Sequence, residues 1–333
     1  MGDVALTVPV LRSVLENNPN LQITLVSNAS FEPFFYDIPR FKFIGIDLNN
    51  YKGVSGLYLL FKKLHKLQKW DSIIDLHSVM RTWVLDWFFK WTGVPVYKVN
   101  KGRAEKKSLT QRIHKNVTPL PHTTERYMQV FKQAGLESPL IIGEAIHANH
   151  VELTDLQLDF NKPWIGIAPF SKHIPKEWPI NKVESLIKNI QQTNKFEILL
   201  FGGGKKEKEV LDHMANKFMG VHSIAGKLDL AAEIGLVKKL KIMVAMDSFN
   251  MHLAALLGVK VISIWGATHS IAGFGPVNGN ERFKVEVPME DLTCRPCSVF
   301  GSKPCYRGDF SCMQHISVEM VEEKINIAMN LLN

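Results

Sequence analysis

Two series of short apolar runs, each alternating with helical stretches, constrain the fold of this chain more than any other feature. The runs are rich in β-branched residues, and those of the first series lie at 21–27, 41–47, 71–76 and 95–99. Those of the second series lie at 164–170, 196–204, 221–226, 241–247 and 259–266. Helical periodicity marks the stretches between them, notably 56–70, 80–93, 122–134, 180–192, 205–218 and 229–239. Strands separated by crossover helices favour parallel sheets, so the sequence predicts an α/β fold with two doubly wound, Rossmann-like domains.

The length of the chain agrees with two domains. Its 333 residues are about twice a common domain length. A polar tract at 150–163 ends in Pro163 and is typical of a junction. We therefore predict an N-terminal domain over 1–155 and a C-terminal domain over 160–333, the latter with a cysteine-rich tract and a terminal helix.

The first series begins with a helix for which no strand is visible. Gly2-Asp3 forms a turn behind Met1, and the apolar face of the following helix consists of Val4, Leu6, Val8, Leu11 and Leu15. The first strand of a doubly wound sheet is central and buried on both faces. We therefore expect a strand upstream of Met1, which would then not be the natural start.

The composition is that of a water-soluble globular protein. Hydrophobic residues make up 46% and charged residues 22% of the chain. No apolar run is long enough to span a bilayer, and the start does not show the basic and apolar regions of a secretory signal. The expected location is therefore the cytoplasm.

The charge of the chain favours an anionic partner. Its formal net charge is +8, and such an excess attracts nucleic acid, acidic membrane surfaces or phosphorylated small molecules. One stretch, 98–115, contains a single acid, Glu105, and the basic residues Lys98, Lys101, Arg103, Lys106, Lys107, Arg112 and Lys115. This run is either a solvated face or a docking surface for a polyanion.

Four stretches fall where an open parallel sheet binds ligands, beside the carboxyl ends of strands and the N-termini of helices. They are Gly2-Asp3, 171–179 with Lys172 and Lys176, the glycine-rich 201–209, and 246–258 with Asp247, Ser248 and His252. Alternative interpretations are a helix cap for Asp3 and a plain flexible turn for the glycines. The glycine-rich stretch matches neither a P-loop nor the G-x-G-x-x-G fingerprint.

All four cysteines lie in one tract, and they are Cys294, Cys297, Cys305 and Cys312. A C-x2-C pair followed by two more cysteines suits tetrahedral zinc, although reduced structural thiols are the other interpretation. The sequence has no Asp-x-Asp pair, no Gly-x-Ser-x-Gly elbow and no HExxH helix. An enzyme of this sequence acting on a diphosphate would therefore be metal-independent and would use basic side chains and helix dipoles.

Taken in order, the motifs resemble the lipopolysaccharide heptosyltransferases of glycosyltransferase family 9. The similar segments are GDVALTVPVLRSV, DLHSVMRTW, HTTERYMQVFKQAGL, IAPFSKHIPKEWP, FGGGKKEKE and MDSFNMHLAALLGVKVISIWGATHS. They extend over nearly the whole chain. The resemblance implies a GT-B fold, in which two Rossmann-like domains face a cleft.

The resemblance also implies an inverting transfer of heptose from ADP-heptose, a co-substrate, to the lipopolysaccharide inner core. Asp3 would be the general base. The donor would be bound by Lys176, Gly203, Glu207, Asp247, Ser248 and His252. The acceptor, an anionic glycolipid at the inner face of the cytoplasmic membrane, would meet Arg81, Lys101, Arg103, Lys106, Lys107 and Arg112. The expected protein is a monomer without a required cofactor, and structural zinc is one of the two interpretations of its cysteines.

Two departures from the family pattern affect the donor site. Phe249 occupies a position where the family often has Gly, and 266–270 reads Gly-Ala-Thr-His-Ser instead of Gly-Pro-Thr-Asp-Pro. These two departures leave the identity of the transferred sugar open. The alternatives are a nucleotide-sugar epimerase of the same fold and a basic polyanion-binding protein without catalysis. Nucleic acid is disfavoured as a partner because aromatic residues do not interleave with the basic run.

Overall fold

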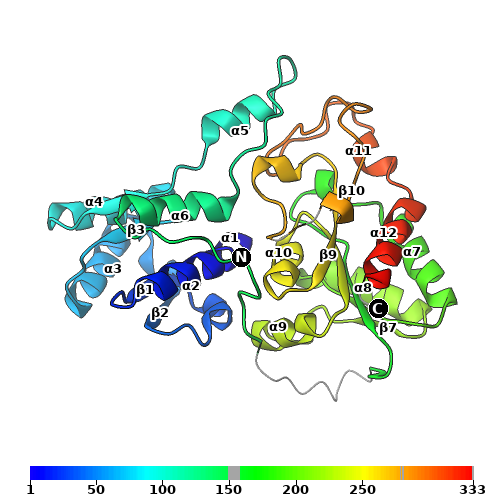
Figure 1. Cartoon of the computed structure of the whole chain (residues 1–333), viewed down its shortest axis with the longest axis horizontal. Coiled ribbons are helices and arrows are strands. Elements are labelled where there is room, and N and C mark those ends of the chain that lie inside the picture. The colour runs from blue at the N-terminus through cyan, green and yellow to red at the C-terminus, as the bar shows by residue number, and fades with distance from the viewer. Residues whose placement is uncertain (149–157, 278, 280, 332–333) are drawn as a thin grey trace. The chain divides into compact units, whose positions relative to one another are not determined.

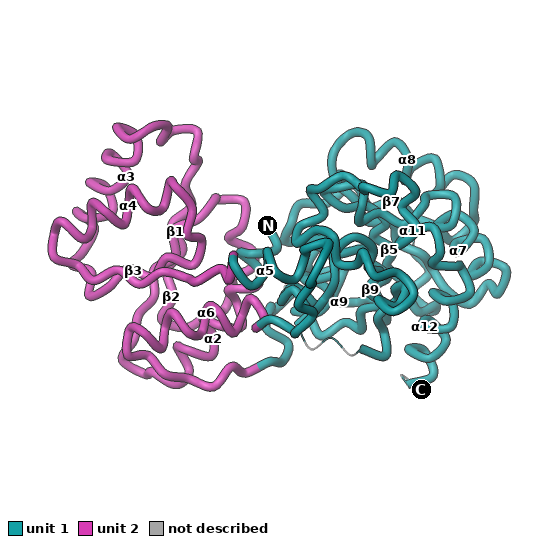
Figure 2. The backbone as a smooth tube through the Cα atoms, turned by 90° about the horizontal axis from the view of Figure 1, so that it is seen from above, with its two compact units in different colours: residues 1–5, 104–120, 142–333 teal, residues 6–103, 121–141 magenta. Residues whose placement is uncertain are grey.

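The computed structural model describes residues 1–148, 158–277, 279 and 281–331. They divide into two compact units (Figure 2). Unit 1 consists of Met1–Ala5, Ala104–Leu120 and Ile142–Asn333, and unit 2 of Leu6–Arg103 and Pro121–Ile141. The units therefore do not follow the chain as two consecutive halves. The predicted junction between 155 and 160 lies partly outside the described residues.

Unit 1 is built on a parallel sheet of six strands in the order β10-β9-β8-β5-β6-β7 (Figure 1). The strands are β5 (Trp164–Ala168), β6 (Glu197–Leu200), β7 (Val221–Ser223), β8 (Ile242–Met246), β9 (Lys260–Trp265) and β10 (Lys284–Glu286). Every residue of β5, β6 and β8 is buried. Burial on both faces explains why these strands are continuous apolar runs without alternation.

Helices bury their apolar sides against this sheet. They are α7 (Ile180–Gln192), α8 (Gly204–Lys217), α9 (Leu230–Lys238), α10 (Phe249–Leu256), α11 (Ser311–Gln314) and α12 (Val318–Asn330). In α7 the buried residues Val183, Leu186, Ile187 and Ile190 recur at the spacing of one helix face. They join α8, α12 and alternate residues of β8 in one core cluster. Neighbouring side chains on a strand point to opposite faces, so Met243 and Ala245 lie on the other side of the sheet.

Unit 2 contains two separate parallel strand pairs. Strand β1 (Ile23–Asn28) pairs with β2 (Phe41–Ile46), and β3 (Ile73–Asp75) pairs with β4 (Val96–Lys98). Within the described residues the two pairs are not hydrogen-bonded to one another. The helices here are α2 (Thr7–Asn17), α3 (Gly53–Leu67), α4 (Met80–Trp91) and α6 (Thr123–Gln133). Their core includes Leu60 and Phe61 of α3 and Phe89 of α4.

The elements confirm the α/β fold class predicted from the alternating runs. Strand β10 and two short helices, α11 and α5 (Arg103–Leu109), were not predicted. The predicted first helix is interrupted, because α1 spans Gly2–Ala5 and α2 begins only at Thr7. Pro9 has no N–H to donate to the carbonyl of Ala5, so the two helices are not joined by that hydrogen bond.

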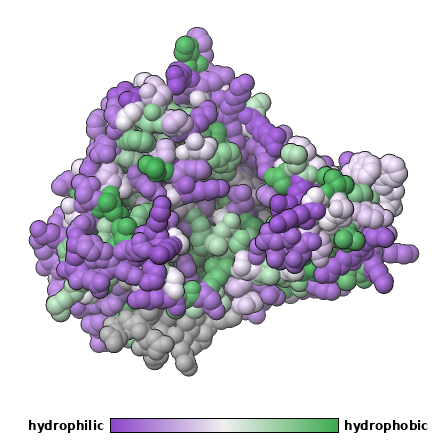
Figure 3. Space-filling view, turned by 180° about the vertical axis from the view of Figure 1, so that it is seen from behind, coloured by the Kyte–Doolittle hydropathy of each residue, from purple (hydrophilic) through white to green (hydrophobic). Residues whose placement is uncertain are grey.

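The surface of the molecule is mixed in character. Figure 3 shows hydrophobic residues reaching the surface in patches between more extensive hydrophilic areas. None of the helices in the described ranges is long and apolar enough to cross a membrane.

Candidate active site

The strand order of unit 1 has a topological switch point between β5 and β8. From β5 the chain winds through β6 and β7 to one side, and it returns with β8 on the other side of β5. The loops that follow β5 and β8 therefore diverge at the carboxyl edge of the sheet. Open α/β sheets bind ligands at such a switch point.

Lys176 and Asp247 meet at this point. Lys176 ends the 3₁₀ helix Ile174–Lys176, and Asp247 follows β8. The Lys176 Nζ donates to the backbone oxygen of Asp247 at 2.6 Å and lies 3.2 Å from its carboxylate Oδ2. Both residues are buried. The Ser171 Oγ also donates to the backbone oxygen of Asp247, at 3.2 Å, so the two loops are tied together.

The N-terminus of α10 adds hydrogen-bond donors at the switch point. Ser248 occupies the N-cap position predicted for it, but its side chain makes no capping hydrogen bond. Its Oγ, like the Oδ1 of Asn250, is buried without a hydrogen-bond partner among the described residues. A helix N-terminus with an unused hydroxyl can bind an anionic group.

The start of the chain lies against the same helix. Helix α1 contacts α10, and a Cβ added to Gly2 would lie 3.2 Å from the Cδ2 of the buried His252. Burial lowers the pKa of the Met1 ammonium; the charge of Asp3 opposes this shift and that of Lys172 adds to it. The structure thus brings exposed Asp3 into the neighbourhood of Lys172 and His252.

The glycine-rich loop follows β6, next to β5 in the sheet. The Glu207 Oε2 accepts a hydrogen bond from the backbone N–H of Gly203 at 2.7 Å. Gly204 has φ of +79°, which favours glycine. A hydrogen bond to Glu207 thus holds the backbone at the start of α8.

Gly301, which the sequence analysis did not single out, packs against Lys176. Its φ is +76°, and a Cβ there would lie 2.5 Å from the Lys176 Cγ. The cysteine-rich tract thereby covers the aliphatic part of the lysine side chain. No local signal marks Gly301, because its partner lies far away in the chain.

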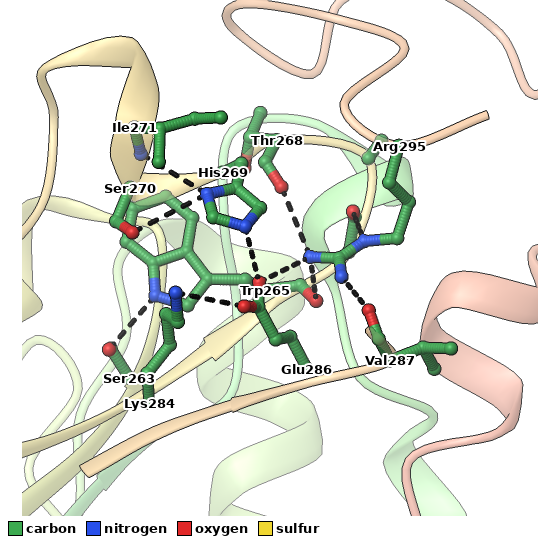
Figure 4. A network of polar contacts seen from close by, with 12 residues as sticks. Ser263, Trp265, Thr268, His269, Ser270, Ile271, Lys284, Glu286, Val287 and Arg295 are labelled. Carbon is green, nitrogen blue, oxygen red and sulfur yellow. Dashed lines mark hydrogen bonds and ion pairs between the residues drawn. The ribbon is translucent and has the colours of Figure 1, made fainter. Parts of the chain in front are cut away.

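A buried polar network fixes the loop after β9 (Figure 4). Arg295 is completely buried, and its Nε donates to the backbone oxygen of Gly266 at 2.7 Å. Its Nη2 lies 2.9 Å from the Glu286 Oε2, which also lies 3.1 Å from the His269 Nε2. Ala267 N–H donates to the Pro175 oxygen at 3.2 Å, so this network is connected to the loop of Lys176.

The same network shifts the pKa of Glu286. Burial alone would raise that pKa, but the hydrogen bond from His269 and the charge of Arg295 outweigh it and lower the pKa to about 2. His269 is one of the residues at which the sequence departs from the family pattern. Its place in the structure is inside this network, where it contacts Glu286.

The four cysteines line one small cavity. Within the described residues, no three His, Cys, Asp or Glu side chains are grouped so that they could hold a metal ion. Burial raises the pKa of Cys297, and it raises the pKa of Cys312 to about 12. Such buried thiols are unreactive. The cysteines form no disulfide, so structural zinc and reduced thiols both remain predictions of the sequence.

The predicted acceptor-binding residues are divided between the units. Unit 2 holds Arg81, Lys101 and Arg103, and unit 1 holds Lys106, Lys107 and Arg112. Lys106 is buried, with its Nζ 4.3 Å from the centre of the Phe274 ring, while the Arg112 guanidinium stacks 4.2 Å from the Tyr306 ring. The basic run is therefore only partly a solvated face. Beside it, a cavity of about 260 Å³ is lined by Arg112, Lys303, Tyr306 and their neighbours.

The two α/β units, with a switch point in the sheet of unit 1, agree with the GT-B fold, which nucleotide-sugar glycosyltransferases share. The model of glycosyltransferase family 9 (heptosyltransferase) matches residues 58–298, so the chain belongs to this family and is a glycosyltransferase.

Known proteins resemble the chain over most of its length. Lipopolysaccharide core heptosyltransferase OpsX of Haemophilus influenzae is 24% identical over 287 residues, which cover 84% of this chain and 79% of the relative. The structure of E. coli ADP-heptose lps heptosyltransferase II superposes with a TM-score of 0.69 at 16% identity, covering 99% of this chain and 96% of that one. E. coli heptosyltransferase WaaC with ADP-2-deoxy-2-fluoro heptose gives a TM-score of 0.65 at 17% identity, with coverage of 98% and 96%. These structural likenesses confirm the predicted fold.

Proposed function

We propose that the protein transfers heptose from ADP-heptose to the inner core of lipopolysaccharide, with inversion at the anomeric carbon. Its family membership supports this proposal, as do relatives named for lipopolysaccharide heptose transfer. The observation that carries it is the meeting of Lys176, Asp247 and the N-terminus of α10 at the switch point of the sheet.

The donor side of the reaction needs positive charge at the leaving diphosphate. When the bond between the anomeric carbon and the phosphate oxygen breaks, negative charge develops on ADP. Lys176 would stabilise that charge together with the N–H groups at the start of α10 and the unused Ser248 hydroxyl. The lysine is held in place by Asp247, so little reorganisation is needed during the reaction.

The nucleoside and sugar would be bound by neighbouring residues. Glu207 would accept hydrogen bonds from the ribose hydroxyls, because its carboxylate is fixed at the loop by Gly203. His252 and Asp247 would contact the heptose and the phosphates. Phe249 occupies the first position of α10, and its ring would shape the pocket for the transferred sugar.

The acceptor side needs a base. Asp3 would take the proton of the acceptor hydroxyl as its oxygen attacks the anomeric carbon from the face opposite the diphosphate. The arginine and lysine side chains of the basic run, with Arg81, would bind the acidic sugars and phosphates of the glycolipid. The protein would act as a monomer in the cytoplasm, at the inner face of the cytoplasmic membrane.

The test is acceptor-dependent release of ADP from ADP-heptose, with Kdo-lipid A as acceptor. Asp3→Asn should lower the rate about 10²–10⁴-fold, which is the usual contribution of a general base. Asp291→Asn, at an exposed carboxylate of the same unit, is the matched control and should retain full activity. Equal rates in Asp3→Asn and the wild type would remove Asp3 from the mechanism. Release from another nucleotide sugar but not from ADP-heptose would contradict the proposed donor.

A further inference from the structure

Three tryptophans lie in a row on the outer side of α4. Trp83, Trp87 and Trp91 are spaced four residues apart, which places them on one helix face. Their exposed fractions are 40%, 51% and 76%. The opposite side of α4 is buried through Asp86 and Phe89. The Trp83 Nε1 donates to the Ser78 Oγ at 3.1 Å, whereas Trp87 and Trp91 are the more exposed of the three rings.

The exposed rings form one continuous surface with helix α3. Trp87 lies 4.9 Å from Trp91 and 5.2 Å from Phe88, measured between ring centres. Phe88 in turn lies 5.2 Å from Tyr58 of α3, which is also exposed. Helices α3 and α4 lie side by side in unit 2 (Figure 1). We define the tryptophan face as Tyr58, Met80, Trp83, Trp87 and Trp91.

Positive charge surrounds the tryptophan face. Residues 52–103 contain ten lysines and arginines, three aspartates and no glutamate. Two of these aspartates, Asp75 and Asp86, are buried. Basic groups also contact the face directly, since the Lys62 Nζ lies 5.2 Å from the centre of the Tyr58 ring and the Arg103 guanidinium 5.9 Å from that of Trp83.

An aromatic surface with a basic rim fits a membrane better than a second copy of the chain. Tryptophan and tyrosine prefer the interface between lipid tails and water, where the ring is buried and its polar group stays hydrated. Lysine and arginine attract anionic headgroups and extend toward them. Two copies of this face would bring like charges together, which is unfavourable.

We propose that the tryptophan face docks the enzyme on an anionic phospholipid bilayer. This inference deepens the proposed function. Membrane docking itself does not depend on that function, but its purpose, which is to reach a lipid-linked acceptor, does. Arg81 lies on the same helix, and Arg103 stacks on Trp83. Docking would therefore bring these two predicted acceptor-binding residues close to the headgroups from which the acceptor sugars project.

Flotation with vesicles tests the proposal directly. The wild type should bind vesicles of phosphatidylethanolamine with a quarter phosphatidylglycerol, and bind phosphatidylcholine vesicles much more weakly. Trp87→Ser/Trp91→Ser should lower the partition coefficient about tenfold or more, because two interfacial rings are lost. The matched control is Phe160→Ser/Met219→Ser, at two exposed apolar residues of unit 1, which should bind within about twofold of the wild type.

A charge variant and a spectroscopic readout make the test sharper. Lys62→Glu/Lys66→Glu, at exposed positions of α3, should also lose about tenfold in binding to anionic vesicles. Brominated lipids should quench the fluorescence of the wild type much more strongly than that of Trp87→Ser/Trp91→Ser, which keeps only Trp83 of the three exposed tryptophans. Of the five tryptophans left in this variant, Trp83 still lies on the tryptophan face, Trp70 is half-buried, and Trp164, Trp178 and Trp265 are buried.

Three results would overturn the proposal. In the first, the wild type does not bind anionic vesicles. In the second, Trp87→Ser/Trp91→Ser binds them as well as the wild type does. In the third, the wild type is a dimer and this variant is a monomer. The last result would assign the face to a second copy. Transfer to a deacylated, water-soluble acceptor separates the two proposals. The tryptophan variant should retain that activity, whereas vesicle binding without transfer in the wild type would contradict only the proposed function.

Discussion

The ammonium of Lys176 lies 3.2 Å from the carboxylate of Asp247 and 2.6 Å from its backbone oxygen. The lysine ends the 3₁₀ helix within the loop after β5, and the aspartate follows β8, the other strand of the switch point. A buried ion pair of this kind adds little net stability, but it fixes the position of both charges. We propose that this fixed lysine is the group that meets the leaving diphosphate.

Replacing Lys176 should damage both catalysis and stability. Lys176→Met is expected to lower the transfer rate about 10²–10³-fold, because a preorganised positive group is lost at the leaving diphosphate. It should also destabilise the protein by about 3 kcal/mol or more, since the Asp247 carboxylate stays buried and loses its partner. Steady-state rates and thermal unfolding measure the two effects. Lys188→Met, at an exposed lysine of α7, should change neither, and an active Lys176→Met would contradict the assigned role.

Gly301 should be needed for activity, although we expect it not to touch substrate. Gly301→Ala places a Cβ against the Lys176 Cγ and adds backbone strain at positive φ. Gly308 offers a matched control, because its φ is +77° and a Cβ there meets nothing within 4 Å. Both variants should lose about 1–2 kcal/mol of stability from the strain, but only Gly301→Ala should lose transfer activity. Equal activity of the two variants would mean that the contact with Lys176 is unimportant.

Glu233 should make stability depend on pH. Burial raises its pKa to about 7 in the folded protein, from the usual value of 4.5. The folded state therefore keeps a proton that the unfolded state has lost, and stability falls as the pH rises from about 4.5 to about 7. Glu233→Gln should remove this loss and be more stable than the wild type at pH 8, by up to about 3 kcal/mol.

Denaturant unfolding at several pH values checks the prediction for Glu233. At pH 4 the variant and the wild type should be about equally stable, because the glutamate is protonated in both states. Glu209→Gln, at an exposed position of α8, should follow the wild type throughout. A Glu233→Gln variant with the same pH profile as the wild type would show that the carboxyl group ionises normally.

Arg295 should be a structural residue of the loop after β9. Arg295→Met removes one partner of Glu286, which keeps its contact with His269, and leaves the carbonyl oxygens of Gly266 and Trp265 without their donor. Breaking a buried pair in this way costs about 3–5 kcal/mol, so the midpoint of thermal unfolding should fall by several degrees or more. Arg307→Met, at a half-exposed arginine of the same tract that pairs with Asp309, is the control and should cost less than about 1 kcal/mol. Similar midpoints in the two variants would contradict the network.

The sequence by itself determined the elements and the class of the protein. Its apolar runs and helical periodicity are local properties, and they predicted β5 to β9 and the helices between them to within a few residues. Ordered motifs such as MDSFNMHLAALLG carried the resemblance to the family, and they lie where parallel strands end. The carboxyl edge of a parallel sheet is a consequence of topology, so Lys176 and Asp247 could be assigned to one site before their distance was known.

Only the tertiary structure decided which distant residues support that site. Two contacts join segments that are far apart in the chain: Gly301 packs against Lys176, and Arg295 binds Gly266 and Glu286. Neither Gly301 nor Arg295 stands out from its own segment of sequence. The same holds for the start of the chain, which packs with α10, and for the split of the basic run between two units. The sequence predicted an apolar helix over the tryptophans of α4. Which side of α4 packs on the core decides whether these tryptophans are exposed. Periodicity shows that they share one face of the helix, but it does not show what covers that face.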